Sequence, residues 1–407
     1  MKIRNHRIRF GNKKFKSSLP LVFHDYGGSY LKILIVFPYV RGMWGGNRIH
    51  VALSSHLSAN HMVDNLSYEI YEGILDEYKK ALGKGELVCL KKRKDSSFYF
   101  PYSVKYLFGG LVDFILSRKI MDMMRRNKYD AILLISSAEG WWIGFFLRKL
   151  KRNGNLLICM HQTDPPLGID LDFYETKKSK NTISLLKNLL MIRFQKMRLR
   201  YFDLFFGQSS WTNRIMEKFY SIKPVGVSGA IDLDSFVLDN SQNAEIQPYV
   251  AVPTAALDSD KIRIIQNLSK EGIELIAYGP VNIPGIINEG FVSDERLKEI
   301  LGKAKVTLFL FDYEGLGLIP FESLAMGTPV VTERKQGPGS ELVSNPYVKF
   351  VEDQNNLAVL LRAYLKANLT YENRTKIRNS IEMYSYKRFA ERVETLLKDN
   401  LDSQTGV

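Results

Sequence analysis

Short apolar runs rich in β-branched residues recur along this chain, with helical patterns between them. The first run, Leu31–Phe37, leads into a glycine-containing turn and then into a helical pattern over Arg48–Leu57. Short apolar runs bounded by turn residues are typical of buried parallel strands. The further expected strands are Ala131–Ile135, Leu156–Met160, Leu204–Phe206, Tyr249–Val252, Glu274–Tyr278, Val306–Phe311, Pro329–Thr332 and Val348–Val351. This alternation predicts an α/β fold with mainly parallel sheets.

The length of the chain indicates two domains, since 407 residues exceed what one typical core supports. The polar segment Asn240–Pro248 indicates a linker between them. We predict a basic N-terminal extension over residues 1–30, an N-terminal Rossmann-like domain over 31–240 and a C-terminal Rossmann-like domain over 241–380. A terminal helix and tail over 381–407 is expected to cross back to the first domain. Two Rossmann-like domains would then face each other across a cleft, at the carboxyl ends of their strands.

Charge and cysteine content restrict the partners and the compartment. The formal net charge of +14 favours phosphates, acidic lipid or nucleic acid as partners. No apolar run approaches the roughly 20 residues that span a bilayer, so any membrane contact should be peripheral. The two cysteines, Cys89 and Cys159, are too few for a disulfide framework. A reducing, cytoplasmic location is therefore expected.

The segment from Tyr313 to Val331 carries the most chemical information. It follows one expected strand and precedes another, and it combines a glycine turn at Gly315 and Gly317 with a short helix expected over Phe321–Met326. A helix N-terminus beside a glycine turn presents free N–H groups and a positive dipole end to an anion. Glu314 and Glu322 flank this turn and can accept hydrogen bonds from sugar or ribose hydroxyls. Acidic capping of a helix would explain the two carboxylates equally well.

The same segment resembles the E-x7-E motif of the group 1 glycosyltransferases, a retaining, family 4-like group with the GT-B fold. The positions that match its pattern are Glu314, Gly315, Gly317, Glu322, Ala325, Gly327, Pro329, Val330 and Val331. Ser323 stands where the family usually has alanine. The resemblance implies that Glu322 binds the nucleotide ribose and that Glu314 lies near the donor sugar. The backbone between them, including Leu316 and Leu318, would contact sugar and phosphate.

Other positions match the family in order and spacing. Gly45 and Gly46, after the first strand, resemble the glycine loop that approaches the donor diphosphate. His161, after the strand Leu156–Met160, resembles the histidine near the transferred sugar, although a lone histidine at a strand end is more often structural. Lys261 can stand for the family's diphosphate-binding lysine. The arginine that usually accompanies it is absent, and Thr254 or the alanine after it stands there. A missing cation should weaken donor binding or leaving-group stabilisation.

Metal ligands and cofactors are not expected. The Asp-x-Asp pattern occurs at Asp170/Asp172, Asp232/Asp234 and Asp258/Asp260, and none of these pairs has the preceding apolar strand that a metal motif requires. We therefore predict no essential metal and no cofactor. Lys261, helix N-termini and glycine-loop amides would neutralise the leaving diphosphate instead.

Two basic stretches carry apolar or aromatic residues as well as cations. Lys91–Phe108 begins with four consecutive cations and continues with aromatic residues, and Lys177–Arg200 has eight basic residues and no acidic one. Such segments are typical either of membrane-surface contacts or of core-facing helices with a cationic outer side. The first interpretation predicts an anionic membrane as a partner, at the inner face of the cytoplasmic membrane. No nucleic-acid-binding module matches, so no nucleic acid partner is expected.

Together these features predict a glycosyltransferase that moves a hexose-type sugar from a UDP- or GDP-sugar to an acceptor hydroxyl with retention. The acceptor would be a glycan, a lipid-linked glycan or a cell-surface polysaccharide precursor. A nucleotide-sugar epimerase can share the fold and would need no acceptor, but the E-x7-E pattern disfavours it. A catalytically silent scaffold that binds a membrane or a partner would explain the missing arginine.

Overall fold

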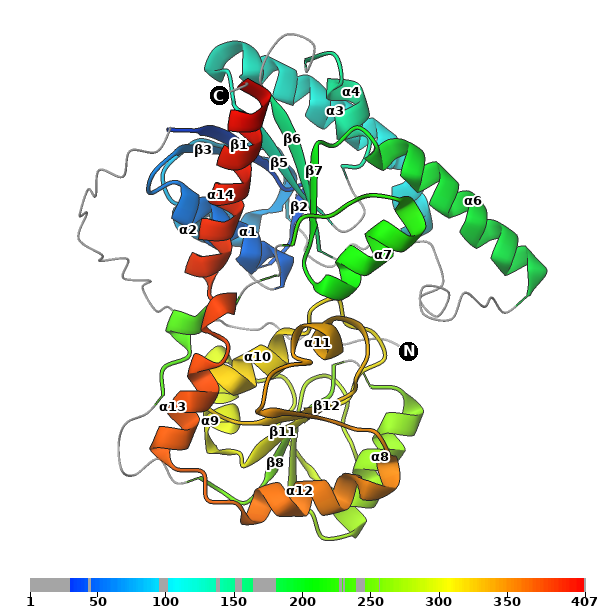
Figure 1. Ribbon diagram of the computed structural model, residues 1–407, viewed down its shortest axis with the longest axis vertical. Helices are drawn as coiled ribbons and strands as arrows, with labels where there is room; N and C mark the ends of the chain where they lie inside the picture. The colour runs from blue at the N-terminus through cyan, green and yellow to red at the C-terminus, as the bar shows by residue number, and fades with distance from the viewer. Residues whose placement is uncertain are drawn as a thin grey trace.

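The structure is a computed structural model that describes residues 30–42, 45–94, 102–136, 140–150, 156–163, 181–226, 229, 231–238, 246–255 and 257–405. Two parallel sheets, each flanked by helices on both faces, form an upper and a lower domain in Figure 1. The mainly parallel α/β architecture expected from the alternating pattern is therefore present. None of the described helices combines the length and apolarity that a membrane span requires.

The N-terminal domain is built on a seven-stranded sheet in the order β2-β3-β1-β5-β6-β7, with β4 also paired to β3. Every described pair in it is parallel. Its strands are β1 (Lys32–Val36), β2 (Tyr39–Val40), β3 (Met62–Tyr71), β4 (Leu87–Arg93), β5 (Ala131–Ser136), β6 (Leu157–Gln162) and β7 (Leu204–Gly207). Its helices are α1 (Gly46–Leu57), α2 (Leu75–Ala81), α3 (Tyr102–Asn127), α4 (Ile143–Leu147), α6 (Thr182–Leu199) and α7 (Ser210–Tyr220).

Strand β1 shows why this sheet is covered on both faces. Its side chains alternate between the two faces, as the pleat of a strand requires. Ile33 and Ile35 belong to a core with α1 and the C-terminal helix, whereas Leu34 and Val36 belong to a core with α3, α4, α6 and α7. Because both faces are buried, the strand is a continuous apolar run rather than an alternating one.

The C-terminal domain has a six-stranded parallel sheet in the order β10-β9-β8-β11-β12-β13. Its strands are β8 (Val250–Pro253), β9 (Leu275–Tyr278), β10 (Ile287–Asn288), β11 (Val306–Phe309), β12 (Val330–Thr332) and β13 (Val348–Phe350). Its helices are α8 (Ser259–Lys270), α9 (Asp294–Lys303), α10 (Leu318–Ala325), α11 (Gln336–Glu341), α12 (Leu357–Lys366) and α13 (Tyr371–Asn379). Helices α9, α10 and α13 share one core beside the sheet, and α8 and α12 share another. Short 3₁₀ helices span Glu72–Ile74, Leu233–Ser235, Gln354–Asn356 and Glu382–Tyr384.

The last helix, α14 (Tyr386–Thr405), returns to the N-terminal domain, as its red ribbon shows in Figure 1. The return begins where Ile231 forms a parallel bridge with Ser385. There the N–H of Ile231 donates to the carbonyl of Tyr384 at 2.8 Å, and the N–H of Tyr386 donates to the carbonyl of Ile231 at 3.0 Å. The side chains of α14 that complete the N-terminal core are Phe389, Ala390, Val393, Leu397 and Leu401.

Several elements differ from the pattern-based expectations. Strands β2, β3, β4 and β10 were not predicted, and α10 begins three residues before the expected Phe321. The start of the basic stretch Lys91–Phe108 belongs to β4, where Lys91 and Arg93 both pair with the buried Glu69. Residues 95–101 and most of the predicted linker lie outside the described residues. The first four residues of Lys177–Arg200 lie outside them too, and the rest of that stretch is mainly α6.

Candidate functional site

The glycine loop after β11 leads directly into helix α10. Gly317 is the residue before the helix and has a φ of 73°, in the left-handed region that glycine tolerates. A Cβ there would also lie only 2.6 Å from the side chain of Pro338. The first N–H groups of α10 therefore follow a glycine turn, which is a suitable place for an anion. Gly315 and Leu316 are buried in this loop, and Leu318 is half-buried.

The first turn of α11, which follows β12, holds the glycine loop in place. Gln336 accepts a hydrogen bond from the Glu314 N–H at 2.7 Å, and its side-chain amide donates to the Asp312 carbonyl at 2.9 Å. Gly337 donates its N–H to the Glu314 carbonyl at 3.2 Å and leaves no room for a Cβ against the backbone of Gly315. Gln336 has a φ of 51°, which costs a non-glycine residue free energy. Glu314 is half-buried, and its backbone is held on both sides.

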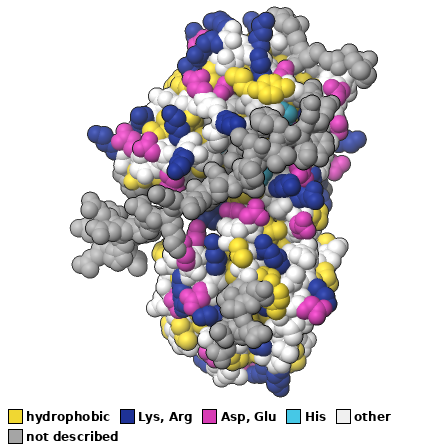
Figure 2. All heavy atoms as spheres, turned by 90° about the vertical axis from the view of Figure 1, so that its left-hand side faces the viewer, with side chains coloured by type: hydrophobic (Ala, Val, Ile, Leu, Met, Phe, Trp, Pro, Cys, Tyr) yellow, Lys and Arg dark blue, Asp and Glu magenta, His cyan; other side chains and the backbone are white. Residues whose placement is uncertain are grey.

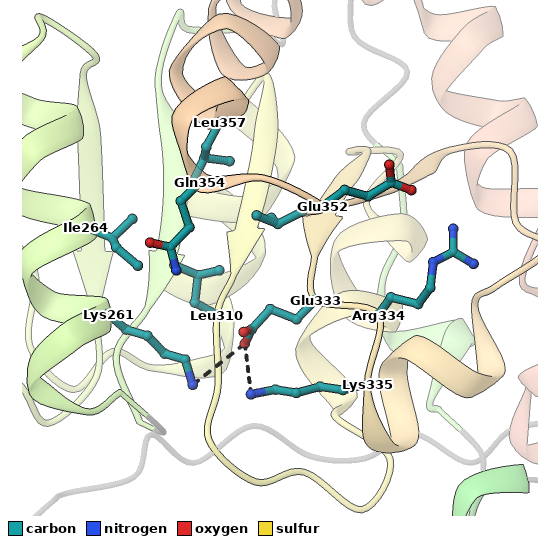
Figure 3. A pocket seen from close by; sticks show the side chains of 10 residues that line it. Lys261, Ile264, Leu310, Glu333, Arg334, Lys335, Glu352, Gln354 and Leu357 are labelled. Carbon is teal, nitrogen blue, oxygen red and sulfur yellow. Dashed lines mark ion pairs between the residues drawn. The ribbon is translucent and has the colours of Figure 1, made fainter. Parts of the chain in front are cut away.

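Lys261 lies on the other side of this loop and is already neutralised. Its ammonium donates to the Phe311 carbonyl and to Asp312 at 2.5 Å, and it lies 3.6 Å from Glu333. Figure 3 shows Lys261 and Lys335 reaching Glu333 from two sides. These residues line an open pocket of about 290 Å³ at the carboxyl ends of β11, β12 and β13. A diphosphate would meet a lysine whose charge is shared between carboxylates.

Glu322 lies in the middle of α10, and only 5% of it is exposed. Burial raises the pKa of its carboxyl to about 7, although the charge of Arg48 opposes this shift. No described residue donates a hydrogen bond to this carboxylate. A buried carboxylate without a donor is unfavourable in the free protein and well suited to a ligand that brings hydroxyl groups.

The N-terminal domain contributes its own residues to this site. Gly45 is the residue before α1, and Gly46 is its first residue. One turn further on, Arg48 forms an ion pair with Asp294 of α9 at 3.0 Å, across the two domains. The glycine loop of the C-terminal domain also reaches the first domain, since a Cβ at Gly229 would lie 2.7 Å from the side chain of Leu316. The fold thus places Arg48, two residues after the predicted glycine loop, where its charge acts on Glu322 of the E-x7-E segment.

His161 is placed differently from the other predicted residues. Its ring is fully buried and stacks on Phe206 at 5.1 Å, with Phe389 of α14 at 5.5 Å. Neither ring nitrogen has a hydrogen-bond partner among the described residues. Burial lowers the pKa of the imidazole to about 3, so the ring is neutral at physiological pH. The backbone beyond it lies closer to the predicted glycine loop, because a Cβ at Gly46 would lie 3.8 Å from Thr163.

The position of the missing arginine is structural. Thr254 is fully buried at the end of β8, where its hydroxyl donates to the Tyr278 carbonyl at 3.2 Å and accepts from the Val281 N–H at 3.1 Å. Arg263, two residues after Lys261, pairs with Asp260 and is largely exposed. No group of three or more potential metal ligands occurs among the described residues.

Sequence reasoning overlooked Arg48, Asp312, Glu333 and Gln336. Each is polar and lies close to a glycine or strand that the sequence pattern had identified. That position was the only sign in the sequence that these residues belong to the site. Their roles depend on pairs more than ten residues apart in the chain, such as Lys261 with Asp312 and Arg48 with Asp294. Such pairing is set by the tertiary fold rather than by local spacing.

Comparison with known proteins agrees with this geometry. Residues 285–388 match the family model described as "Glycosyl transferases group 1", which covers the glycine loop, α10 and the β12–α11 loop. The chain is a glycosyltransferase with the GT-B fold, and the part of it that matches the group 1 family is residues 285–388. No curated protein matches it by sequence.

Solved structures are similar in fold over nearly the whole glycosyltransferase. Sucrose-phosphate synthase from Thermosynechococcus elongatus superposes with a TM-score of 0.64 and 14% identity, covering 92% of this chain and 100% of the other. HepE from Anabaena, in complex with UDP and glucose, superposes with a TM-score of 0.61 and 12% identity. The match covers 91% of this chain and 100% of HepE. The N-terminal domain of trehalose-6-phosphate phosphatase from Candida albicans superposes with a TM-score of 0.63 and 12% identity. The match covers 96% of this chain and 98% of the other. These likenesses confirm the predicted fold of two Rossmann-like domains.

The pKa of Glu322 leads to a test on the glycosyltransferase without ligand. A carboxyl whose pKa is raised on folding binds its proton more tightly when folded. The protein therefore loses stability as the pH rises from the usual carboxyl range through about 7. Replacing Glu322 by Gln should stabilise the protein at pH 8, by up to about 3 kcal/mol, and have little effect at pH 5. Urea unfolding at both pH values measures this, with the exposed Glu274→Gln as control. An equal effect of Glu322→Gln at both pH values would contradict the raised pKa.

The buried ring of His161 gives the opposite pH dependence. Its pKa is lowered on folding, so the folded protein loses stability as the pH falls from about 6.5 toward 3. His161→Leu removes this loss, and between pH 7 and pH 5 it should lose about 2 kcal/mol less stability than the wild type. His50, whose pKa burial lowers to about 4, remains in both proteins. If urea unfolding shows parallel losses in both proteins, the ring is not sealed from water.

Proposed function

We propose that this glycosyltransferase transfers a hexose-type sugar from a UDP- or GDP-sugar to an acceptor hydroxyl, with retention of configuration. The observation that supports this best is the buried carboxylate of Glu322, which has no donor among the described residues and lies in a helix that begins at the glycine loop. A ribose diol would supply the missing hydrogen bonds. HepE, a protein of the same fold, was solved with UDP and glucose, which is consistent with a UDP-sugar here.

In this scheme the bond between the anomeric carbon and the diphosphate oxygen breaks, and a bond to the acceptor oxygen forms on the same face of the sugar. The acceptor hydroxyl loses its proton, and the nucleoside diphosphate leaves. The leaving group needs charge stabilisation more than the enzyme needs a strong nucleophile. The N–H groups of Leu316 to Leu318 and of Gly45 and Gly46 would meet the diphosphate. Glu314 and the backbone beside His161 would orient the sugar.

Lys261 would contribute less positive charge than a free lysine, because Asp312 and Glu333 already engage it. We assign the second cation to Arg48. It stands at the start of α1 beside Gly45 and Gly46, and it is the cation with the largest effect on the pKa of Glu322. A diphosphate bound between the two domains would draw Arg48 away from Asp294. Arg48 would then take the place of the arginine that is absent near Thr254.

The acceptor is proposed to be a glycan carried on a lipid, used for a cell-surface polysaccharide or glycolipid, and the enzyme would work at the inner face of the cytoplasmic membrane. Support comes from the cationic, partly apolar surface of the N-terminal domain, where the acceptor would bind. Turnover would need no metal, since amides, Lys261 and Arg48 neutralise the leaving group. Turnover that stops with EDTA and resumes with Mg²⁺ or Mn²⁺ would contradict this.

Donor binding tests the proposal directly. A panel of nucleotide sugars is screened by thermal shift, because a ligand that binds only the folded state raises the unfolding temperature. The best donor should bind Glu322→Gln about 10- to 100-fold more weakly, since charge-assisted hydrogen bonds to the ribose are lost. Glu274→Gln, an exposed carboxylate in the same domain, serves as the control. Undiminished binding by Glu322→Gln would refute its role, and an epimerised donor without added acceptor would identify an epimerase.

The assignment of Arg48 has its own matched pair of variants. Arg48→Met should weaken binding of the nucleoside diphosphate product about 10-fold or more, because a charge-assisted phosphate contact disappears. Arg263→Met changes the same residue type on an exposed helix surface near Lys261 and should leave binding unchanged. Isothermal titration calorimetry with UDP or GDP measures both. The reverse outcome, with only Arg263→Met impaired, would place the second cation on α8.

A further inference from the structure

Helix α6 is folded with its polar side inward. Its buried residues include Asn188, Gln195 and Arg198. Gln195 accepts a hydrogen bond from the Tyr220 hydroxyl at 2.6 Å, and the Arg198 guanidinium lies 4.8 Å from the ring of Trp141. A surface helix of a soluble domain normally buries its apolar stripe instead. The apolar residues of α6 that pack on its own domain are Leu199, Met191 and Ile192, and the remaining apolar residues of the helix are not used in this packing.

The apolar residues of α6 form a stripe on the outer side. Leu186 is 58% exposed and Leu190 is 59% exposed. Intervals of three and four residues place side chains on one face of a helix. The exposed members of this stripe are Ile183, Leu186, Leu190, Phe194 and Met197. A continuous apolar stripe of this kind on a monomer indicates a contact with something else.

The stripe continues across α4 to α3. Phe194 of α6 contacts the Trp142 ring with centroids 5.7 Å apart, and Trp142 contacts Phe146 of α4 at 6.4 Å. Phe146 in turn contacts Phe114 of α3 at 5.5 Å. Three residues of α3, namely Leu111, Phe114 and Ile115, are exposed beside this row of rings. Figure 1 shows α3 and α4 together at the outer end of the N-terminal domain, with one end of α6 projecting beyond the body. We call this surface of α3, α4 and α6 the outer face.

Arginines surround the outer face. Arg118 lies over Phe114 and Arg148 over Phe145, while Arg193 and Arg200 are exposed on α6. Asp122, which pairs with Arg125, is the only exposed carboxylate on the described parts of α3, α4 and α6. By contrast, Figure 2 shows Lys and Arg interspersed with Asp and Glu on the side that it turns to the viewer. The cationic excess on the outer face is therefore a local feature.

From this juxtaposition we infer that the outer face docks on an anionic lipid bilayer, with the α6 stripe among the acyl chains and the arginines at the headgroups. The inference rests on the proposed function in that it brings the N-terminal domain to a lipid-linked acceptor. Apolar helix faces rimmed by cations bind at the interface of anionic membranes. A second copy of the chain fits less well, because a two-fold interface would place arginine rims of both copies against each other.

The test uses the full chain and sucrose-loaded vesicles of phosphatidylcholine mixed with phosphatidylglycerol, separated by centrifugation. Wild-type protein should sediment with these vesicles and much less with phosphatidylcholine alone. The double variant Leu186→Glu/Leu190→Glu should lower the partition coefficient on the order of a hundredfold, since two apolar side chains no longer enter the bilayer. Both leucines are exposed, so the variant should fold. Arg193→Glu/Arg200→Glu tests the charge separately and should abolish the preference for phosphatidylglycerol.

The control is Val359→Glu, which places one new glutamate at a 64% exposed apolar position on α12 of the other domain. It should bind vesicles like the wild type. Wild-type protein that stays in solution with both vesicle types overturns the inference. A wild-type dimer in sedimentation equilibrium that Leu186→Glu/Leu190→Glu converts to monomer overturns it too, since a second copy would then cover the face. Donor binding measured in solution should be unchanged in Leu186→Glu/Leu190→Glu. The donor-binding assay therefore tests the proposed function separately from the vesicle assay, which tests membrane docking.

Discussion

Two adjacent chain crossings hold the domains of this glycosyltransferase at one relative position. Ile231 pairs with Ser385, and the guanidinium of Arg378 donates to the carbonyls of Leu233 and Phe236 just beyond the first crossing. Because α14 then completes the N-terminal core, the domains cannot separate without breaking that core. The position of Arg48 relative to Asp294 and Glu322 depends on these crossings.

The contacts between the domains away from these crossings include the ring contact of Trp211 with Tyr313 at 5.8 Å and several polar pairs. Glu341 of α11 accepts hydrogen bonds from the N–H and the hydroxyl of Ser210 at the start of α7, and Arg48 pairs with Asp294. Polar, partly exposed contacts contribute little net stability and can be exchanged for ligand contacts. Arg48 acts on both Asp294 and Glu322, so a phosphate that took over Arg48 would change the domain contact and the charge around Glu322 together. One side chain then couples donor binding to domain position.

Patterns in the sequence predicted those parts of the fold whose strands are continuous apolar runs, and the Glu314–Glu322 segment that connects two of them. Strand β3 was not predictable in this way, because it buries Asp64, Asn65, Ser67 and Glu69 among its apolar residues. Each partner that permits this burial comes from elsewhere: Asn65 bonds to His50, and Glu69 to Lys91 and Arg93. In the sequence Lys91 and Arg93 resembled a free cationic patch, because their partner Glu69 lies more than twenty residues earlier in the chain. The buried state of His161 likewise depends on Phe389, more than two hundred residues later in the chain.

Two features of this glycosyltransferase are locally unfavourable, and they lie in different domains. Glu322 is a buried carboxylate without a donor in the described chain, and α6 exposes leucines while it buries Asn188 and Gln195. Natural folds depart from their own packing rules mainly where function compensates the cost. The two departures call for different compensation, because the carboxylate needs hydroxyl donors and the helix needs an apolar medium beside anionic groups. Under the proposed function a nucleotide sugar would supply the hydroxyl donors, and under the inferred docking a bilayer would supply the apolar medium.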